Sequence, residues 1–168
     1  MAQARLPVFY REYGVADTVN GRFDLLVLHL ALVLDRMAQD PQLLETGQAL
    51  FDHFCSDMDH NLREMGVGDL SVPRQMRRVG EAYYGRAKAY RAALAHGSQD
   101  ELADALKRNI DAGREAGHAA VTRLAAYIME AVGHLREQPA AQLATGALRL
   151  PDPATTVFVE AEPVSTKA

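Results

Sequence analysis

Apolar residues recur every three or four positions through most of the first 138 residues, which is the spacing of helices with one face in a core. Segments with this spacing cover residues 17–38, 41–65, 71–95, 98–110 and 121–138, and one helical turn is expected within 7–13. The first long segment also carries leucines on its other faces, so it is expected to be the central helix. The pattern therefore predicts an all-α, single-domain bundle of five or six helices around one core.

Capping residues stand at the ends of these segments. The expected N-caps are Asp17, Thr18 or Asn20 for the first long helix, Asp40 before Pro41 for the second, Ser71 before Pro73 for the third, and Ser98 for the fourth. Ser98 begins an S-x-x-E capping box that ends at Glu101. Gly14, Gly66 and Gly97 follow helical segments and are expected to end them.

The last thirty residues differ from the rest because they contain four prolines. Residues 1–138 are therefore predicted to form the helical domain, and residues 139–168 a mostly irregular tail. Alternation with period two appears only in TVFVEAE, residues 156–162, which is expected to add one strand or to fold over the body.

Composition limits the classes of protein that fit. The net charge is −4, the chain is 48% hydrophobic, and Cys55 is the only cysteine, so an internal disulfide and a cysteine-based zinc site are excluded. The most apolar run, residues 25–34, is half of the roughly 20 residues needed to span a bilayer. The N-terminus resembles neither a signal peptide nor a transit peptide. A soluble protein without a membrane span is expected, either in a bacterial cytoplasm or in an organelle matrix.

Candidate chemistry is sparse. His53, Asp57 and His60 share one face of a predicted helix, and His29 is their one distant partner for a metal or haem site. No Glu-x-x-His motif accompanies them, so a polar helix face is the favoured interpretation. Cys55 is flanked by carboxylates, which raise a thiol pKa. We predict no catalytic residue, no metal and no cofactor.

The stretch GVGDLSVP, residues 66–73, contains two closely spaced glycines but is not a phosphate loop. It lacks the Gly-Lys-Ser/Thr ending, the preceding strand and the third glycine of the known nucleotide motifs. It is expected to be a turn in which Gly66 ends one helix and Ser71 begins the next.

Charge is the most informative feature. Residues 74–91 carry six basic side chains and one acidic, whereas residues 1–73 carry five basic and eleven acidic. Arginines begin the predicted helix after the turn, and acids end the helix before it; both placements oppose the helix dipole. One interpretation is an antiparallel helix pair whose charges match across the turn. The other is that the basic face also binds a partner, and the sequence favours neither.

Tyr84 lies on the same predicted face as Arg77, Lys88 and Arg91, while Tyr83 and Tyr90 lie on the core stripe. Aromatic residues with arginine are typical of protein interfaces, and they also suit RNA. The candidate partner-binding residues are Asp69, Leu70, Val72, Arg74, Arg77, Arg78, Tyr84, Arg86, Lys88 and Arg91.

The segment DMDHNLREMGVGDLSVPRQMRRVGEAYYGRAKAY, residues 57–90, resembles the ubiquinol-cytochrome c chaperone family. The resemblance implies an all-α binding protein without catalysis, which holds newly made cytochrome b for the bc1 complex of the respiratory chain. Mitochondrial members also act beside the ribosomal exit with a small partner protein. Without a transit peptide this chain is similar to an alphaproteobacterial member, peripheral at the inner face of the cytoplasmic membrane. The alternative is an RNA- or ribosome-binding module that uses residues 74–91.

Overall fold

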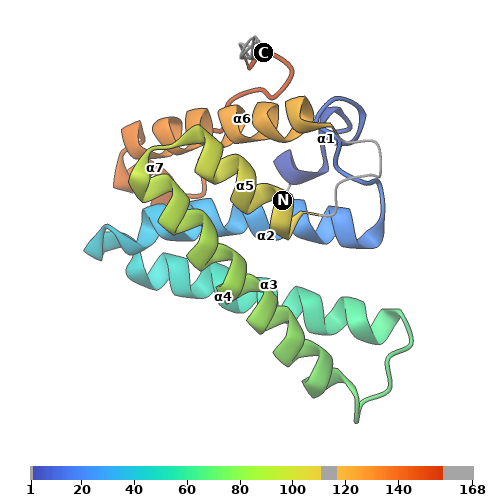
Figure 1. Ribbon diagram of the computed structural model, residues 1–168. Coiled ribbons are helices and arrows are strands. Elements are labelled where there is room, and N and C mark those ends of the chain that lie inside the picture. Colours follow the sequence, from blue (N-terminus) through green and yellow to red (C-terminus); the bar gives the residue numbers. More distant parts are fainter. Residues whose placement is uncertain (1, 111–116, 157–168) are drawn as a thin grey trace, which may run out of the picture.

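The computed structural model describes residues 2–110 and 117–156. The described chain forms the 3-10 helices η1 (Gln3–Arg5) and η2 (Pro41–Leu43) and the α-helices α1 (Val8–Arg11), α2 (Val19–Ala38), α3 (Leu44–Glu64), α4 (Val72–His96), α5 (Gln99–Asn109), α6 (His118–Glu137) and α7 (Ala140–Ala144) (Figure 1). The predicted all-α class with five long helices is confirmed. Apart from Thr156, the TVFVEAE segment lies outside the described residues.

The central position predicted for the first long helix is confirmed. Helix α2 contacts α3, α4 and α6, and it buries eleven of its 20 residues (Figure 1). Thr18 caps it, since its hydroxyl accepts a hydrogen bond from the backbone N–H of Gly21 at 3.0 Å. A side chain at Gly21 is excluded because its Cβ would lie 2.0 Å from the carbonyl oxygen of Ala16.

Aromatic side chains join the N-terminal segment to α2 and α6. The ring of Phe9 lies 5.3 Å from that of Tyr13, 5.4 Å from that of His29 and 5.1 Å from that of Tyr127. The described part of the tail is anchored to the same region, because the Tyr13 hydroxyl donates a 2.6 Å hydrogen bond to the carbonyl oxygen of Pro153. The tail also begins with α7, a helix that the sequence did not indicate.

Most predicted helix ends are confirmed, and three details differ. Gly66 and Gly97 have φ angles of 83° and 68°, as glycines that end helices do. The segment after Asp40 starts with the 3-10 turn η2 rather than directly as α-helix. The Ser71 side chain makes no capping hydrogen bond. Ser98 accepts from the Glu101 N–H, but the Glu101 carboxylate binds His96 at 2.6 Å, so the capping box is half formed.

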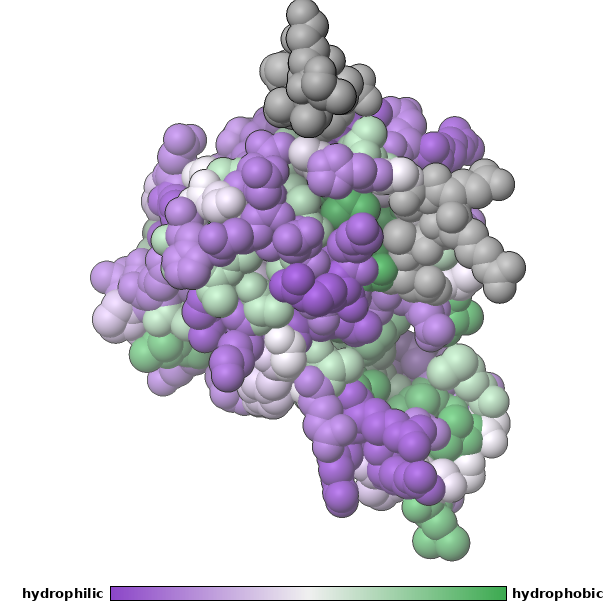
Figure 2. Space-filling view, viewed as in Figure 1, coloured by the Kyte–Doolittle hydropathy of each residue, from purple (hydrophilic) through white to green (hydrophobic). Residues whose placement is uncertain are grey.

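Helices α3 and α4, residues 44–96, form an antiparallel pair that we call the α3–α4 hairpin. Its turn forms a tip away from α5 and α6 (Figure 1), where Figure 2 shows exposed hydrophobic side chains. Charge matching across this turn was a wrong interpretation, since no ion pair among the described residues joins the two helices. The acids pair within their own segment: Arg63 binds Asp59 at 2.6 Å and also Asp69, and His60 lies 3.2 Å from Glu64.

Candidate functional site

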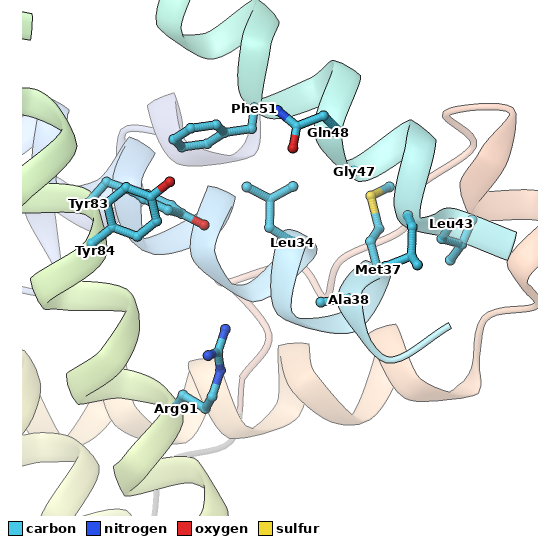
Figure 3. Close-up of a pocket in the computed structure, with 11 residues that line it drawn as sticks. Leu34, Met37, Ala38, Leu43, Gly47, Gln48, Phe51, Tyr83, Tyr84 and Arg91 are labelled. Atoms are coloured by element: carbon cyan, nitrogen blue, oxygen red, sulfur yellow. The ribbon is translucent and has the colours of Figure 1, made fainter. Parts of the chain in front are cut away.

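An open groove of about 250 Å³ lies between α3 and α4, with α2 as its floor (Figure 3). Its lining residues are mostly apolar or aromatic: Leu34, Met37 and Ala38 from α2, Leu43, Leu44, Gly47, Gln48 and Phe51 from η2 and α3, and Tyr83, Tyr84 and Arg91 from α4. Pockets that enclose a drug-sized ligand measure roughly 300–1,000 Å³. This groove has room for one or two large apolar side chains of a partner.

Close packing of α2 against α3 fixes the floor of the groove. A Cβ atom at Gly47 would lie 3.3 Å from Cβ of Met37, so glycine lets the two helices approach here. Leu43 is fully buried, whereas its neighbour Leu44 is 54% exposed. The floor is therefore held by the core, while an apolar edge of α3 stays accessible.

Three aromatic rings form the wall at the other end of the groove. The ring of Phe51 on α3 lies 4.9 Å from that of Tyr83 and 5.9 Å from that of Tyr84 on α4. Tyr83 is 8% exposed and faces the core, as its position on the core stripe predicted. Tyr84 is 64% exposed and presents its ring to solvent beside the groove. Tyrosine in this position offers apolar area with a polar end, which suits a transient protein interface.

Arg91 is the one charged side chain that lines the groove among the described residues. Its Nε lies 2.5 Å from a carboxylate oxygen of Asp35 on α2. The other oxygen of Asp35 accepts a 3.0 Å hydrogen bond from Gln39. On the opposite rim, Gln48 of α3 donates to the carboxylate of Asp52 at 2.8 Å. The groove thus has a cation on its α4 side and an anion beside its α3 side.

A buried ion pair holds α4 against α2 next to the groove. The Arg86 guanidinium lies 2.6 Å from the carboxylate of Asp24, and both side chains are largely shielded from solvent. The guanidinium also lies over the ring of Phe23, at 5.4 Å from its centroid. Burial raises the pKa of the neighbouring Tyr90, which stays neutral. Arg86 therefore positions α4 and is not part of its exposed basic face.

The structure separates the ten candidate residues into three groups. Exposed on α4 or its turn are Leu70, Arg74, Arg77, Arg78, Tyr84, Lys88 and Arg91. Asp69 is exposed but paired with Arg63. Val72 is buried, and Arg86 is engaged by Asp24. Only Tyr84 and Arg91 of the ten line the groove.

Sequence reasoning missed the parts of the groove that come from α2 and α3. Leu34, Met37 and Phe51 follow the apolar spacing of their helices, and nothing in the chain distinguishes them from ordinary core residues. The adjacent pair Leu43 and Leu44 at the start of a helix was no clear signal either, because adjacent apolar residues can both lie on a core-facing stripe, as Val27 and Leu28 do.

The histidines do not assemble a metal site. His53 and His60 are exposed and lie near acids of their own helix, Asp57 at 3.7 Å and Glu64 at 3.2 Å. His29 lies in the core, where burial lowers its pKa to about 4. Among the described residues no group of three or more His, Cys, Asp or Glu side chains has the arrangement of a metal site.

The groove contains no group that sequence or structure marks as a nucleophile. Cys55 lies outside the lining, and burial, with a smaller effect of Asp52, raises its thiol pKa as predicted. A high pKa keeps a thiol in its less reactive, protonated form. The groove is therefore suited to binding apolar side chains next to a cation. None of the described helices is both long and apolar enough to span a bilayer.

Comparisons with known proteins cover the whole of this region. The sequence matches the ubiquinol-cytochrome C chaperone family over residues 11–150. The crystal structure of the Cbp3 homolog from Brucella abortus matches with a TM-score of 0.82 and 38% sequence identity, over 93% of this chain and 86% of that chain. No curated protein matches the chain. Every residue that lines the groove falls within the part that matches the family.

Proposed function

The chain belongs to the ubiquinol-cytochrome C chaperone family, and from this membership we propose that it is a non-catalytic assembly chaperone for the ubiquinol-cytochrome c reductase (bc1) complex. Its client is newly made cytochrome b, which it holds until the protein is assembled. The family match over residues 11–150 is the observation that carries this proposal. The chain acts peripherally, at the inner face of the cytoplasmic membrane.

The groove supports the proposal because it offers what a holding protein needs. Its apolar lining is accessible on a rigid floor, so it can cover a few exposed apolar side chains of a client. Its small volume and open shape favour a short contact that is released when the client is assembled. The exposed cations of α4 extend the contact surface beyond the groove. Ribosome or RNA binding by residues 74–91 remains a prediction from the charge of α4 alone.

Deletion of the gene tests the proposed function. We expect the deletion strain to lose most of its assembled bc1 complex and its b-type haem absorbance, and the wild-type gene on a plasmid to restore both. Native gels with antibodies to cytochrome b and to the catalytic subunits give the readout. Normal amounts of cytochrome b in the deletion strain would contradict the proposed function.

Site-specific photocrosslinking tests the proposed surface. Photoreactive residues at Leu44, Tyr84 and Lys88 are expected to crosslink to cytochrome b in cells that synthesise it. Arg108 on α5 is the matched control, because it is an exposed cation that does not line the groove. Crosslinks of equal strength from all four positions would place client binding elsewhere.

A further inference from the structure

We propose that the groove selects its client segment by charge as well as by hydrophobicity. The segment is amphipathic: its apolar side chains enter the groove, and a carboxylate on one side of it binds Arg91 in exchange for Asp35. This inference rests on the proposed function and specifies the chemistry of the client segment.

The two rims of the groove carry opposite charges. Arg77, Lys88 and Arg91 lie on the α4 side, on the helix face that also presents Tyr84 and a single acid, Glu81. Among the described residues, Arg77 and Lys88 form no ion pair, so they too are available to an acidic partner. Beside the α3 rim lie Glu45 and Asp52, which repel carboxylates. A segment with acids along one side therefore fits in one orientation, with that side toward α4.

Arg91 is well placed for the exchange. Its side chain is 62% exposed, and an ion pair at such a site contributes only about 0–1 kcal/mol. When Arg91 turns away from Asp35, the Asp35 carboxylate keeps the hydrogen bond from Gln39 and is partly exposed to water. It is therefore not left buried without a partner. Arg91 points from α4 toward the groove (Figure 3), where an incoming apolar side chain would shield a new ion pair from solvent.

Asp35 has a defined role in this arrangement. It holds Arg91 at the mouth of the empty groove and competes with the carboxylate of the client. Removal of its charge should therefore strengthen client binding, while removal of the Arg91 charge should weaken it. A purely hydrophobic groove predicts neither effect, and a structural ion pair predicts a loss of stability in both variants.

A panel of designed peptides tests the proposal with the full chain. Three fluorescent 18-residue helical peptides share one Leu/Phe face and carry three Glu, three Gln or three Lys residues along one flank. Fluorescence anisotropy at low salt is expected to give the tightest binding for the Glu peptide, with the Gln peptide about three- to tenfold weaker and the Lys peptide weaker still.

The variants identify the residues responsible. Arg91→Gln should abolish the preference for Glu over Gln, and Asp35→Asn should tighten binding of the Glu peptide about two- to threefold. Arg108→Gln, an exposed charge outside the groove, should change neither value. Thermal melts must show that all three variants remain folded. An unchanged preference in Arg91→Gln, equal affinity for the three peptides, or no binding of any peptide overturns the proposal.

Two further outcomes are informative. A dimer in sedimentation equilibrium that Tyr84→Ala dissociates would assign the groove to a second copy of the chain and overturn the proposal. In the deletion strain, full rescue of the bc1 complex by Arg91→Glu would overturn charge selection but leave the chaperone function standing. A normal amount of bc1 complex in the deletion strain would instead contradict the proposed function itself.

Discussion

Helices α2 and α3 have nearly the same length but very different surroundings. Helix α2 buries eleven of its 20 residues, whereas α3 buries two of its 21 residues, Gly47 and Phe54. The first is enclosed by α3, α4 and α6, whereas the second contacts α2, η2 and α4 and leaves most of its residues outside the core. The difference shows that the core forms around one central helix, while most of α3 lies at the surface, including the exposed apolar side chain of Leu44.

This contrast extends to the parts of the molecule around each helix. The body, formed by α2, α5, α6 and the N-terminal segment, is joined by aromatic contacts and by the anchored tail. The α3–α4 hairpin carries the exposed side chains of Met65, Leu70 and Tyr84. Regions with fewer buried contacts open at lower free energy, so we expect the hairpin to adapt to a client while the body stays fixed.

The largest expected effect comes from removing one partner of the buried ion pair between the two regions. Asp24→Ala leaves the Arg86 guanidinium shielded from water without its 2.6 Å partner. Loss of one member of a buried ion pair costs about 3–5 kcal/mol, so the free energy of unfolding should fall by an amount in that range. Urea denaturation measures it. Protection of α4 amides from hydrogen exchange should decrease more than protection of α6 amides.

A double variant shows how much of the loss in the free energy of unfolding comes from leaving the Arg86 charge buried and unpaired. In Asp24→Ala/Arg86→Met no unpaired charge remains, and the methionine can still pack against Phe23. We expect it to be more stable than Asp24→Ala. If the double variant is the less stable of the two, Arg86 stabilises the position of α4 through contacts other than Asp24, such as its stacking on Phe23.

The sequence predicted the helices and their buried faces well because helix spacing and capping are local. The stripe of Tyr83 and Tyr90 was assigned to the core and Tyr84 to the surface, and their burial confirms this. Ion pairing was predicted less well, since an arginine finds acids one turn away within its own segment more easily than across a turn. Arg63 therefore binds Asp59 and Asp69 and leaves the cations at the start of α4 without acidic partners from α3.

The second-largest effect is expected in the body, where protonation of His29 at low pH should reduce the stability of the fold. Neutral His29 is buried, with Nδ1 2.8 Å from the carbonyl oxygen of Leu25 and Nε2 3.0 Å from the Tyr127 hydroxyl. Burial lowers its pKa to about 4, against 6.5 in the unfolded chain, so the unfolded state binds the proton between these values. His29 therefore supports folding above pH 6.5, and this support is lost as the pH falls toward 4.

At about 1.36 kcal/mol per pH unit, protonation of His29 should reduce the free energy of unfolding by about 2 kcal/mol between pH 7 and pH 5. Urea denaturation at both values measures the change. His29→Gln should show a loss smaller by that amount, because carboxylates titrate alike in both proteins. Equal losses in the two proteins would show that His29 is not the group that titrates.

The groove was harder to predict than the body because it depends on how three helices meet. Its lining comes from residues as far apart as Leu34 and Arg91. Each of these positions is ordinary in its own helix, and only the packing angle of α3 against α4 turns them into one surface. Gly47 lets α3 approach α2 at the floor of the groove, yet its sequence context does not distinguish it from other helical glycines.

The smallest expected effect on stability comes from the exposed surface of the hairpin. Tyr84→Ala removes an exposed ring that touches Phe51 and Tyr83 at one edge, so it should lower the free energy of unfolding by less than about 1 kcal/mol. The same change should strongly reduce crosslinking of cytochrome b from Lys88.

Leu70→Ala is the matched control, because Leu70 is fully exposed and lies outside the groove. It should leave stability unchanged and crosslinking close to wild type. If Leu70→Ala abolishes crosslinking and Tyr84→Ala does not, the tip of the hairpin, and not the groove, is the surface that the client contacts.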